Sequence, residues 1–101
     1  MTTIISETEG RIVVALSGDL DTAACGQVER DLAPLFERDD CDIVVDCAEL
    51  DYISSSGLRI LLNIYKHVRK NGHKAYLRQP SDDVKEVLQI GGFLQLFEQE
   101  D

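Results

Sequence analysis

The residues with the clearest chemical potential in this chain are three consecutive serines followed by a glycine, Ser54 to Gly57. They separate a short apolar run from the longest helical pattern, so Ser55 or Ser56 is expected at the N-terminus of a helix. Free backbone N–H groups and the helix dipole favour an anion there, and a phosphate on one of these serines could be held. Simple N-capping, the structural alternative, explains one hydroxyl but not three.

Ser56 is a poor candidate for a catalytic nucleophile. A nucleophile elbow has the pattern G-x-S-x-G, and its first glycine is missing here. An acyl-transfer serine also needs a nearby general base. His67 lies about three turns along the same expected helix and His73 lies beyond its end, so we expect both histidines to face solvent. The sequence therefore predicts a protein that is not an enzyme.

Acidic residues dominate the charge of the chain, with 19 Asp and Glu against 10 Lys and Arg and a formal net charge of -9. This balance disfavours nucleic acid and anionic lipid surfaces as direct partners. Asp39-Asp40, Asp82-Asp83 and the acidic residues from Glu98 to Asp101 are neighbouring charges in expected loops, caps and a tail, which is typical of a solvated surface. Asp46, after an apolar strand, could bind a cation or cap a backbone amide, and we favour the cap. No metal site or cofactor is expected.

The length of 101 residues fits one domain, residues 1-101, with a core that needs no disulfide or metal. The longest purely apolar run, Ile12 to Leu16, is far below the roughly 20 residues that span a bilayer. The N-terminus shows no basic segment leading into an apolar one.

Cys25, Cys41 and Cys47 have no metal-site spacing, and we expect Cys25 and Cys47 to be buried and Cys41 to lie at a loop edge. These features favour a cytoplasmic protein without membrane insertion.

The expected elements alternate between strands and helices. Strands are expected at Ile4-Ile5, 11–17, 43–45, 74–78 and, more weakly, 94–97. Helices are expected from a cap at Asp21 or Thr22 to Pro34, from 56 to 70, and from a cap at Ser81 to Gly91-Gly92. A loop is expected from Leu50 to Ser55. Right-handed crossovers between parallel strands follow from this order. The predicted fold class is α/β, a mixed β-sheet of four to five strands with three or more α-helices packed on it.

The longest expected helix carries a basic stripe on an otherwise acidic protein. Its members are Arg59, Asn63, Lys66 and Lys70, bordered by Ile60 and Ile64, whereas its apolar face is expected to hold Leu58, Leu61, Leu62, Tyr65 and Val68. The stripe is either a docking face for a partner or an ordinary polar face. In the second case Ile60 and Ile64 are buried because the helix lies deep against the sheet.

Three motifs of the chain resemble those of a known family. They are Ser17-Gly18-Asp19-Leu20-Asp21 with Ala23-Ala24, then Ile43-Val44-Val45-Asp46, then Tyr52-Ile53-Ser54-Ser55-Ser56-Gly57-Leu58-Arg59. In this order and spacing the chain resembles the STAS domain of bacterial anti-sigma factor antagonists. The closing segment from Val87-Leu88 to Gly92-Phe93-Leu94 is similar to the last helix of that family.

The resemblance implies a partner-switching protein. The unphosphorylated form would bind an anti-sigma factor that is also an ATP-dependent serine kinase, phosphorylation would release it, and a serine phosphatase would reset the cycle. The family's phosphoacceptor maps onto Ser56, with Ser55 as the alternative; Ser54 departs from the family, which typically carries aspartate there. The expected partner-binding residues are Asp19, Asp21, Ser54, Ser55, Gly57, Leu58, Arg59, Ile60 and Asn63.

A second function remains open from the same resemblance. Similar small STAS proteins are subunits on the cytoplasmic side of membrane transport assemblies and need no phosphorylation. Co-purification with a membrane complex would favour this alternative over the partner switch.

Overall fold

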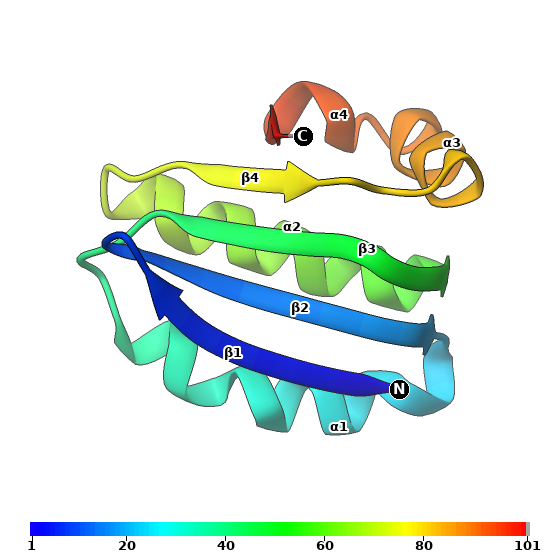
Figure 1. Cartoon of the computed structure of the whole chain (residues 1–101), viewed down its shortest axis with the longest axis horizontal. Helices are drawn as coiled ribbons and strands as arrows, with labels where there is room; N and C mark the ends of the chain where they lie inside the picture. Colours follow the sequence, from blue (N-terminus) through cyan, green and yellow to red (C-terminus); the bar gives the residue numbers. More distant parts are fainter. Residues whose placement is uncertain (101) are drawn as a thin grey trace.

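A five-stranded sheet forms the centre of the computed structural model, which describes residues 1–100 (Figure 1). The strands are β1 (Thr2–Thr8), β2 (Arg11–Leu20), β3 (Ile43–Ile53), β4 (Ala75–Arg78) and β5 (Glu98–Glu100), and their spatial order follows the chain. β1 and β2 form an antiparallel hairpin, whereas β2, β3, β4 and β5 are parallel neighbours. The expected Glu9-Gly10 turn is confirmed, since both residues have positive φ.

Helices make the crossovers between the parallel strands. They are α1 (Thr22–Leu32), the 3-10 helix η1 (Ala33–Glu37), α2 (Ser55–Lys70), α3 (Asp82–Ile90) and α4 (Phe93–Leu96). Figure 1 shows α1 and α2 behind the sheet, with α3 and α4 at the far edge beside β4. The side chain of Asp21, one of the two candidates expected from the sequence, caps α1, and that of Ser81 caps α3 as predicted. Pro34 ends α1 as expected, because the chain tightens into η1.

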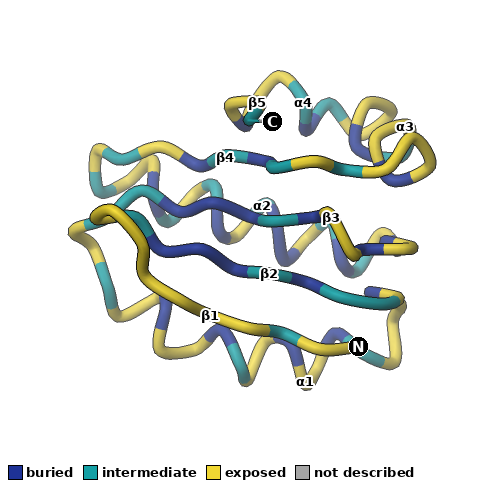
Figure 2. Tube along the Cα trace, viewed as in Figure 1, coloured by how far each residue is buried: buried dark blue, intermediate teal, exposed yellow. Residues whose placement is uncertain are grey.

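The core lies between the sheet and the two long helices. Alternate residues of β2, namely Ile12, Val14 and Leu16, join Ile43, Val45 and Leu77 against the helices. Figure 2 shows that buried positions concentrate in the middle strands, whereas the edge strand β1 is exposed. Cys25 and Cys47 are buried and Cys41 is half-buried, as expected.

The opposite face of the sheet has a polar cover. The guanidinium of Arg11 lies over the ring of Tyr76 and donates to Glu100 Oε1 at 2.6 Å. Arg78 donates to Glu100 Oε2 at 2.6 Å. These side chains stand on the same sheet face as Val44, which is fully buried although it is absent from the main core. The network therefore ties the short strand β5 to β2 and β4.

Two expected elements differ in the structure. β3 continues through Ile53, where we predicted a loop from Leu50 to Ser55. The β2–β3 ladder shifts register twice, and from Cys47 to Ile53 the strand buries every third residue instead of every second. The strand expected at 94–97 is wrong, because Phe93–Leu96 forms α4 and the strand follows at Glu98–Glu100. Both errors arise where burial departs from the period of two that marks a strand in sequence.

The buried face of α2 is rotated from the expected one. Gly57, Ile60, Leu61, Ile64 and Val68 are its buried residues, whereas Leu58, Leu62 and Tyr65 are only half-buried. The helix lies deep enough to bury both isoleucines beside the basic stripe. The interpretation in which Ile60 and Ile64 belong to the core is therefore confirmed.

Candidate functional site

The segment Ser54 to Gly57, which we call the serine loop, lies where β2 and β3 end together at the carboxyl edge of the sheet. Leu20 and Ile53 are the last partners in their ladder. The next residue after each is a helix cap: Asp21 begins α1 and Ser54 begins α2. The two helix N-termini are therefore held side by side at the edge where open α/β sheets place their sites.

Ser54 is the serine that the fold uses structurally. It is 9% exposed, and its hydroxyl donates to the carbonyl of Leu20 at 3.0 Å while accepting from the amide of Gly57 at 3.1 Å. The backbone amide of Ser54 donates to the same Leu20 carbonyl at 2.9 Å. Ser54 thus connects the end of β2 to the first turn of α2.

Gly57 allows α2 to approach the sheet closely. A Cβ at this position would lie 2.8 Å from Cγ of Leu20 and 2.9 Å from Cγ1 of Ile53. Both neighbours are buried side chains with little room to move. Glycine is therefore required here by packing and not by backbone conformation.

The remaining serines face outward from the first turn of α2. Ser55 is exposed and Ser56 is half-exposed. Because the first backbone N–H groups of a helix have no partner within it, a phosphate on either residue would lie beside uncompensated donors and the positive end of the dipole. A phosphoryl group on either serine would lie outside the hydrogen bonds of the Ser54 cap.

Three carboxylates surround a shallow hollow next to this loop. Asp19, Asp21 and Asp51 line it together with Met1, Gly18, Ala23 and Ala24. Asp46 does not line this hollow, and it does not follow its strand as expected. It lies within β3, accepts from the amide of Ala48 at 3.0 Å and stands 3.9 Å from Arg78. The backbone-capping role predicted for Asp46 is confirmed.

The expected partner-binding residues separate into two groups. Asp19, Asp21, Ser55, Arg59 and Asn63 are exposed, and Leu58 is half-exposed. Ser54, Gly57 and Ile60 are buried, and a direct contact between any of them and a partner stays a prediction. The packing and hydrogen bonds of these buried residues set the positions of the exposed residues around them.

Both histidines have protein partners and are only half-exposed, contrary to the expectation that they face solvent. Nε2 of His67 is within hydrogen-bonding distance of the carbonyl of Arg38, and its ring meets that of Phe36 edge-on. Nδ1 of His73 lies 3.2 Å from Oδ1 of Asp42. Both residues therefore hold the segment that leads into β3 and lie away from Ser56.

Tyr52 is a surface residue of this site that the sequence-based list omitted. Its side chain is 50% exposed, and it is the ladder partner of Asp19. An aromatic residue two positions before Ser54 is visible in the sequence as a candidate surface contact. The loop predicted from Leu50 to Ser55 gives Tyr52 no fixed orientation, whereas β3 presents it from a regular strand.

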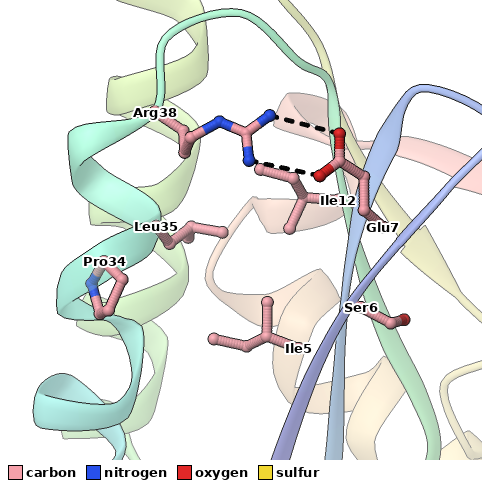
Figure 3. Close-up of a pocket in the computed structure, with 7 residues that line it drawn as sticks. All are labelled: Ile5, Ser6, Glu7, Ile12, Pro34, Leu35 and Arg38. Carbon is pink, nitrogen blue, oxygen red and sulfur yellow. Dashed lines mark hydrogen bonds and ion pairs between the residues drawn. The ribbon is translucent and has the colours of Figure 1, made fainter.

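A separate hollow lies between β1 and η1 (Figure 3). Ile5 and Leu35 face one another across it, and Arg38 donates to both carboxylate oxygens of Glu7 at 3.3 Å at its rim. It shares no lining residue with the hollow beside the serine loop.

Within residues 1–100, no cluster of three or more candidate metal-ligating side chains occurs. No helix in the same range has the length and apolar character needed to cross a membrane.

Comparisons with known proteins agree with this geometry. The STAS domain family model matches residues 3–101. BtrV of Bordetella bronchiseptica, described as a proposed anti-sigma factor antagonist, is 35% identical over 89 residues, which make up 88% of this chain and 77% of BtrV. The solved structure of unphosphorylated SpoIIAA, an anti-sigma factor antagonist, has a TM-score of 0.82 at 20% identity and covers 99% of this chain and 89% of SpoIIAA. Phosphorylated SpoIIAA, a Bacillus cell fate determinant, has a TM-score of 0.75 at 20% identity, and the match covers 99% of this chain and 92% of SpoIIAA. The predicted mixed sheet with packed helices is confirmed.

Proposed function

This chain belongs to the STAS domain family, and from that premise we propose that it is a cytoplasmic anti-sigma factor antagonist switched by phosphorylation of Ser56. The unphosphorylated protein binds an anti-sigma factor that is also a serine kinase. ATP-dependent phosphorylation of Ser56 releases this partner, and a serine phosphatase restores the binding form. The protein acts by being bound and released, and it catalyses no reaction itself.

The observation that carries this proposal is that the three serines differ in burial and in hydrogen bonding. Ser54 is buried and occupied as the helix cap, whereas Ser56 is half-exposed in the first turn of the same helix. A kinase can therefore reach Ser56 while the cap stays intact. A phosphoserine adds about -1.5 to -2 charge, which changes the electrostatics of an edge that already carries Asp19, Asp21 and Asp51.

The named relatives support the same assignment. BtrV is described as a proposed anti-sigma factor antagonist, and SpoIIAA shares the fold and exists in phosphorylated and unphosphorylated forms. Ser54 gives this loop a neutral hydroxyl where the family typically carries a carboxylate. The kinase of this protein therefore recognises a loop that is less negative before phosphorylation.

Phosphate mapping tests the proposal directly. The purified protein is incubated with the anti-sigma factor kinase of its own cell, ATP and Mg²⁺, and the products are analysed by tandem mass spectrometry. Phosphate is expected on Ser56, and the Ser56→Ala variant is expected to remain unmodified. Ser55→Ala is the matched control, because it removes the neighbouring hydroxyl and leaves the proposed acceptor in place.

Binding measurements test the consequence of the modification. Ser56→Ala should bind the anti-sigma factor persistently in the presence of ATP, whereas Ser56→Asp should bind more weakly because it adds negative charge. Equal affinity of the two variants would contradict the switch. An unmodified loop together with stable co-purification in a membrane transport assembly would favour a constitutive STAS subunit.

A further inference from the structure

A groove between α1 and α2 lies along the same helix that presents Ser56. Its floor is apolar and buried, formed by Leu32 and Ile60, and Ala33 and Phe36 form one wall. Phe36 keeps 36% of its surface exposed in this position. Glu29 from α1 and Asn63 from α2 complete the lining. The groove therefore offers apolar surface between two polar helix faces.

The α2 side of this groove carries cations that the protein itself does not neutralise. Arg59, Lys66 and Lys70 are exposed, and none of them forms an ion pair within residues 1–100. The chain has 19 acidic residues that could have supplied partners. Arg11, Arg38 and Arg78 pair with carboxylates, whereas Arg30, Arg69, Lys74 and Lys85 resemble the stripe residues in forming no ion pair in this range. The stripe differs from these four because its cations lie together on one helix face. The basic stripe is thus an uncompensated charge on an acidic molecule.

The spacing along α2 places Ser56 at the end of this stripe. Arg59 follows Ser56 by three residues, Asn63 follows Arg59 by four, and Lys66 follows Asn63 by three. Residues three and four apart are neighbours on a helix surface. A phosphate on Ser56 would therefore stand on the same face as the stripe and within one turn of Arg59.

We propose that the α1–α2 groove and the basic stripe bind an amphipathic helix of the partner, with apolar residues in the groove and acidic residues against α2. An apolar ridge at helical spacing fits a groove of this kind. The acidic flank complements Arg59 and Lys66, which otherwise have no counter-charge. This inference rests on the proposed function, and it specifies the chemistry of the partner segment.

A second copy of this chain is a poorer occupant than an acidic helix. Symmetric pairing through α2 would place two basic stripes together, so that like charges face each other across the interface. An acidic helix from a different protein meets the stripe with opposite charge. The charge distribution therefore favours a heterologous partner.

The arrangement gives the phosphate two ways to weaken binding. It repels the acidic flank of the partner helix directly, and it attracts Arg59 away from that flank through a charge-assisted hydrogen bond. Both effects act at the first turn of α2, so no rearrangement of the core is needed. Release then follows from competition for one cationic stripe.

Charge reversal on the stripe tests the electrostatic half of the inference. The double variant Arg59→Glu/Lys66→Glu should lower affinity for the purified anti-sigma factor by about tenfold or more and reduce the salt dependence of binding. Lys85→Glu is the control, because it reverses an exposed charge on α3, outside the groove. Titration calorimetry at two salt concentrations measures both quantities.

Filling the groove tests the apolar half. Ala33→Trp places a large side chain in the groove from an exposed position and should also weaken binding by about tenfold. Glu37→Trp adds the same ring to η1 at a residue outside the groove lining and serves as the control. Circular dichroism confirms that each variant is folded before binding is measured.

The outcomes separate this inference from the proposed function. If the wild-type protein does not bind the anti-sigma factor, the proposed function fails and the inference fails with it. If the wild type binds and is released by phosphorylation, but the stripe and groove variants bind as tightly as their controls, only the inference is overturned. Selective loss in both sets of variants supports it.

Discussion

The hydroxyl of Ser54 donates a hydrogen bond of 3.0 Å to the backbone carbonyl of Leu20, 34 residues earlier in the chain. This bond joins the last residue of β2 to the cap of α2. Asp21, which follows Leu20, caps α1. The hydroxyl therefore adds to the backbone bond from the Ser54 amide and to the Leu20–Ile53 ladder pair in holding the N-termini of α1 and α2 together.

Replacing Ser54 with alanine should destabilise the protein more than replacing the other serine cap. Ser54→Ala removes two hydrogen bonds at a buried position and should lower the free energy of unfolding by about 1–3 kcal/mol. Ser81→Ala, at the exposed cap of α3, removes one bond and should cost about 0.5–1.5 kcal/mol. Urea denaturation followed by circular dichroism measures both. Equal losses would show that the bond to Leu20 contributes nothing.

Alanine at Gly57 should be unfavourable despite its better helix propensity. The new methyl group would lie 2.8 Å from Leu20 and 2.9 Å from Ile53, and such overpacking typically costs about 1–3 kcal/mol. Gly26→Ala is the matched control within α1, where the nearest heavy atom to a Cβ is the end of the Arg30 side chain at 3.7 Å. That change should be neutral or stabilise by up to about 1 kcal/mol. A stabilising Gly57→Ala variant would contradict the close packing of α2 on β2.

Aspartate at Ser56 should leave the stability of the fold nearly unchanged. Ser56 lies in the first turn of α2, where the helix dipole favours a negative charge by about 0.3–1 kcal/mol. Nearby Asp19, Asp21 and Asp51 oppose this gain. Thermal unfolding of Ser56→Asp should therefore match the wild type closely. A large loss of stability would mean that weakened partner binding by this variant reports unfolding instead of charge.

Glu100 should make the stability of the protein depend on pH in the acidic range. Hydrogen bonds from Arg11 and then Arg78 lower the pKa of Glu100 below its usual value. Since the folded-state pKa is below the unfolded one, the stabilisation is complete above the unfolded pKa of about 4.3 and is lost as pH falls through the folded pKa.

Comparison of two glutamates in β5 isolates this effect. The difference in Tm between the wild type and Glu100→Gln should be largest near about pH 6 and should shrink below about pH 3. Glu98→Gln removes the same charge from the same strand without touching the arginine pairs, and should show a smaller difference. A Glu100→Gln difference that is constant with pH would contradict the ion-pair network.

The three thiols should differ in reactivity. Burial raises the pKa of Cys47 to about 12, and burial also raises that of the half-buried Cys41. At about pH 8 neither is substantially a thiolate, so iodoacetamide should label the native protein slowly. Cys41 should react first, whereas Cys25 and Cys47 should react only after unfolding in urea. Rapid native labelling of Cys47, detected by mass spectrometry, would contradict its burial.

Local signals in the sequence were sufficient for several elements. A helix cap at Asp21 or Thr22, a cap at Ser81 and a turn at Glu9-Gly10 are predictable from the sequence, because each depends on a side chain or backbone conformation within a few residues. The sequence also places the three serines between an apolar strand and the longest helix, although β3 extends to Ile53 and α2 begins at Ser55. These features need no knowledge of distant contacts.

Other features depend on contacts between distant segments. The extension of β3 to Ile53 follows from its ladder with β2, whose two register shifts change the spacing of buried residues. The burial of Ile60 follows from the packing of α2 against α1 and the sheet. Sequence periodicity alone could not choose between the two possible apolar faces of α2, since both contain well-spaced aliphatic residues.

The sequence by itself determined the α/β order of elements, the acidic character of the surface and the identity of the serine loop, because composition, caps and apolar spacing are local properties. Only the tertiary structure decided which serine is buried, which carboxylates share the edge and which side chains of α2 remain exposed. Those outcomes depend on how β2, β3 and the helices pack, and packing is fixed by contacts between residues far apart in the chain.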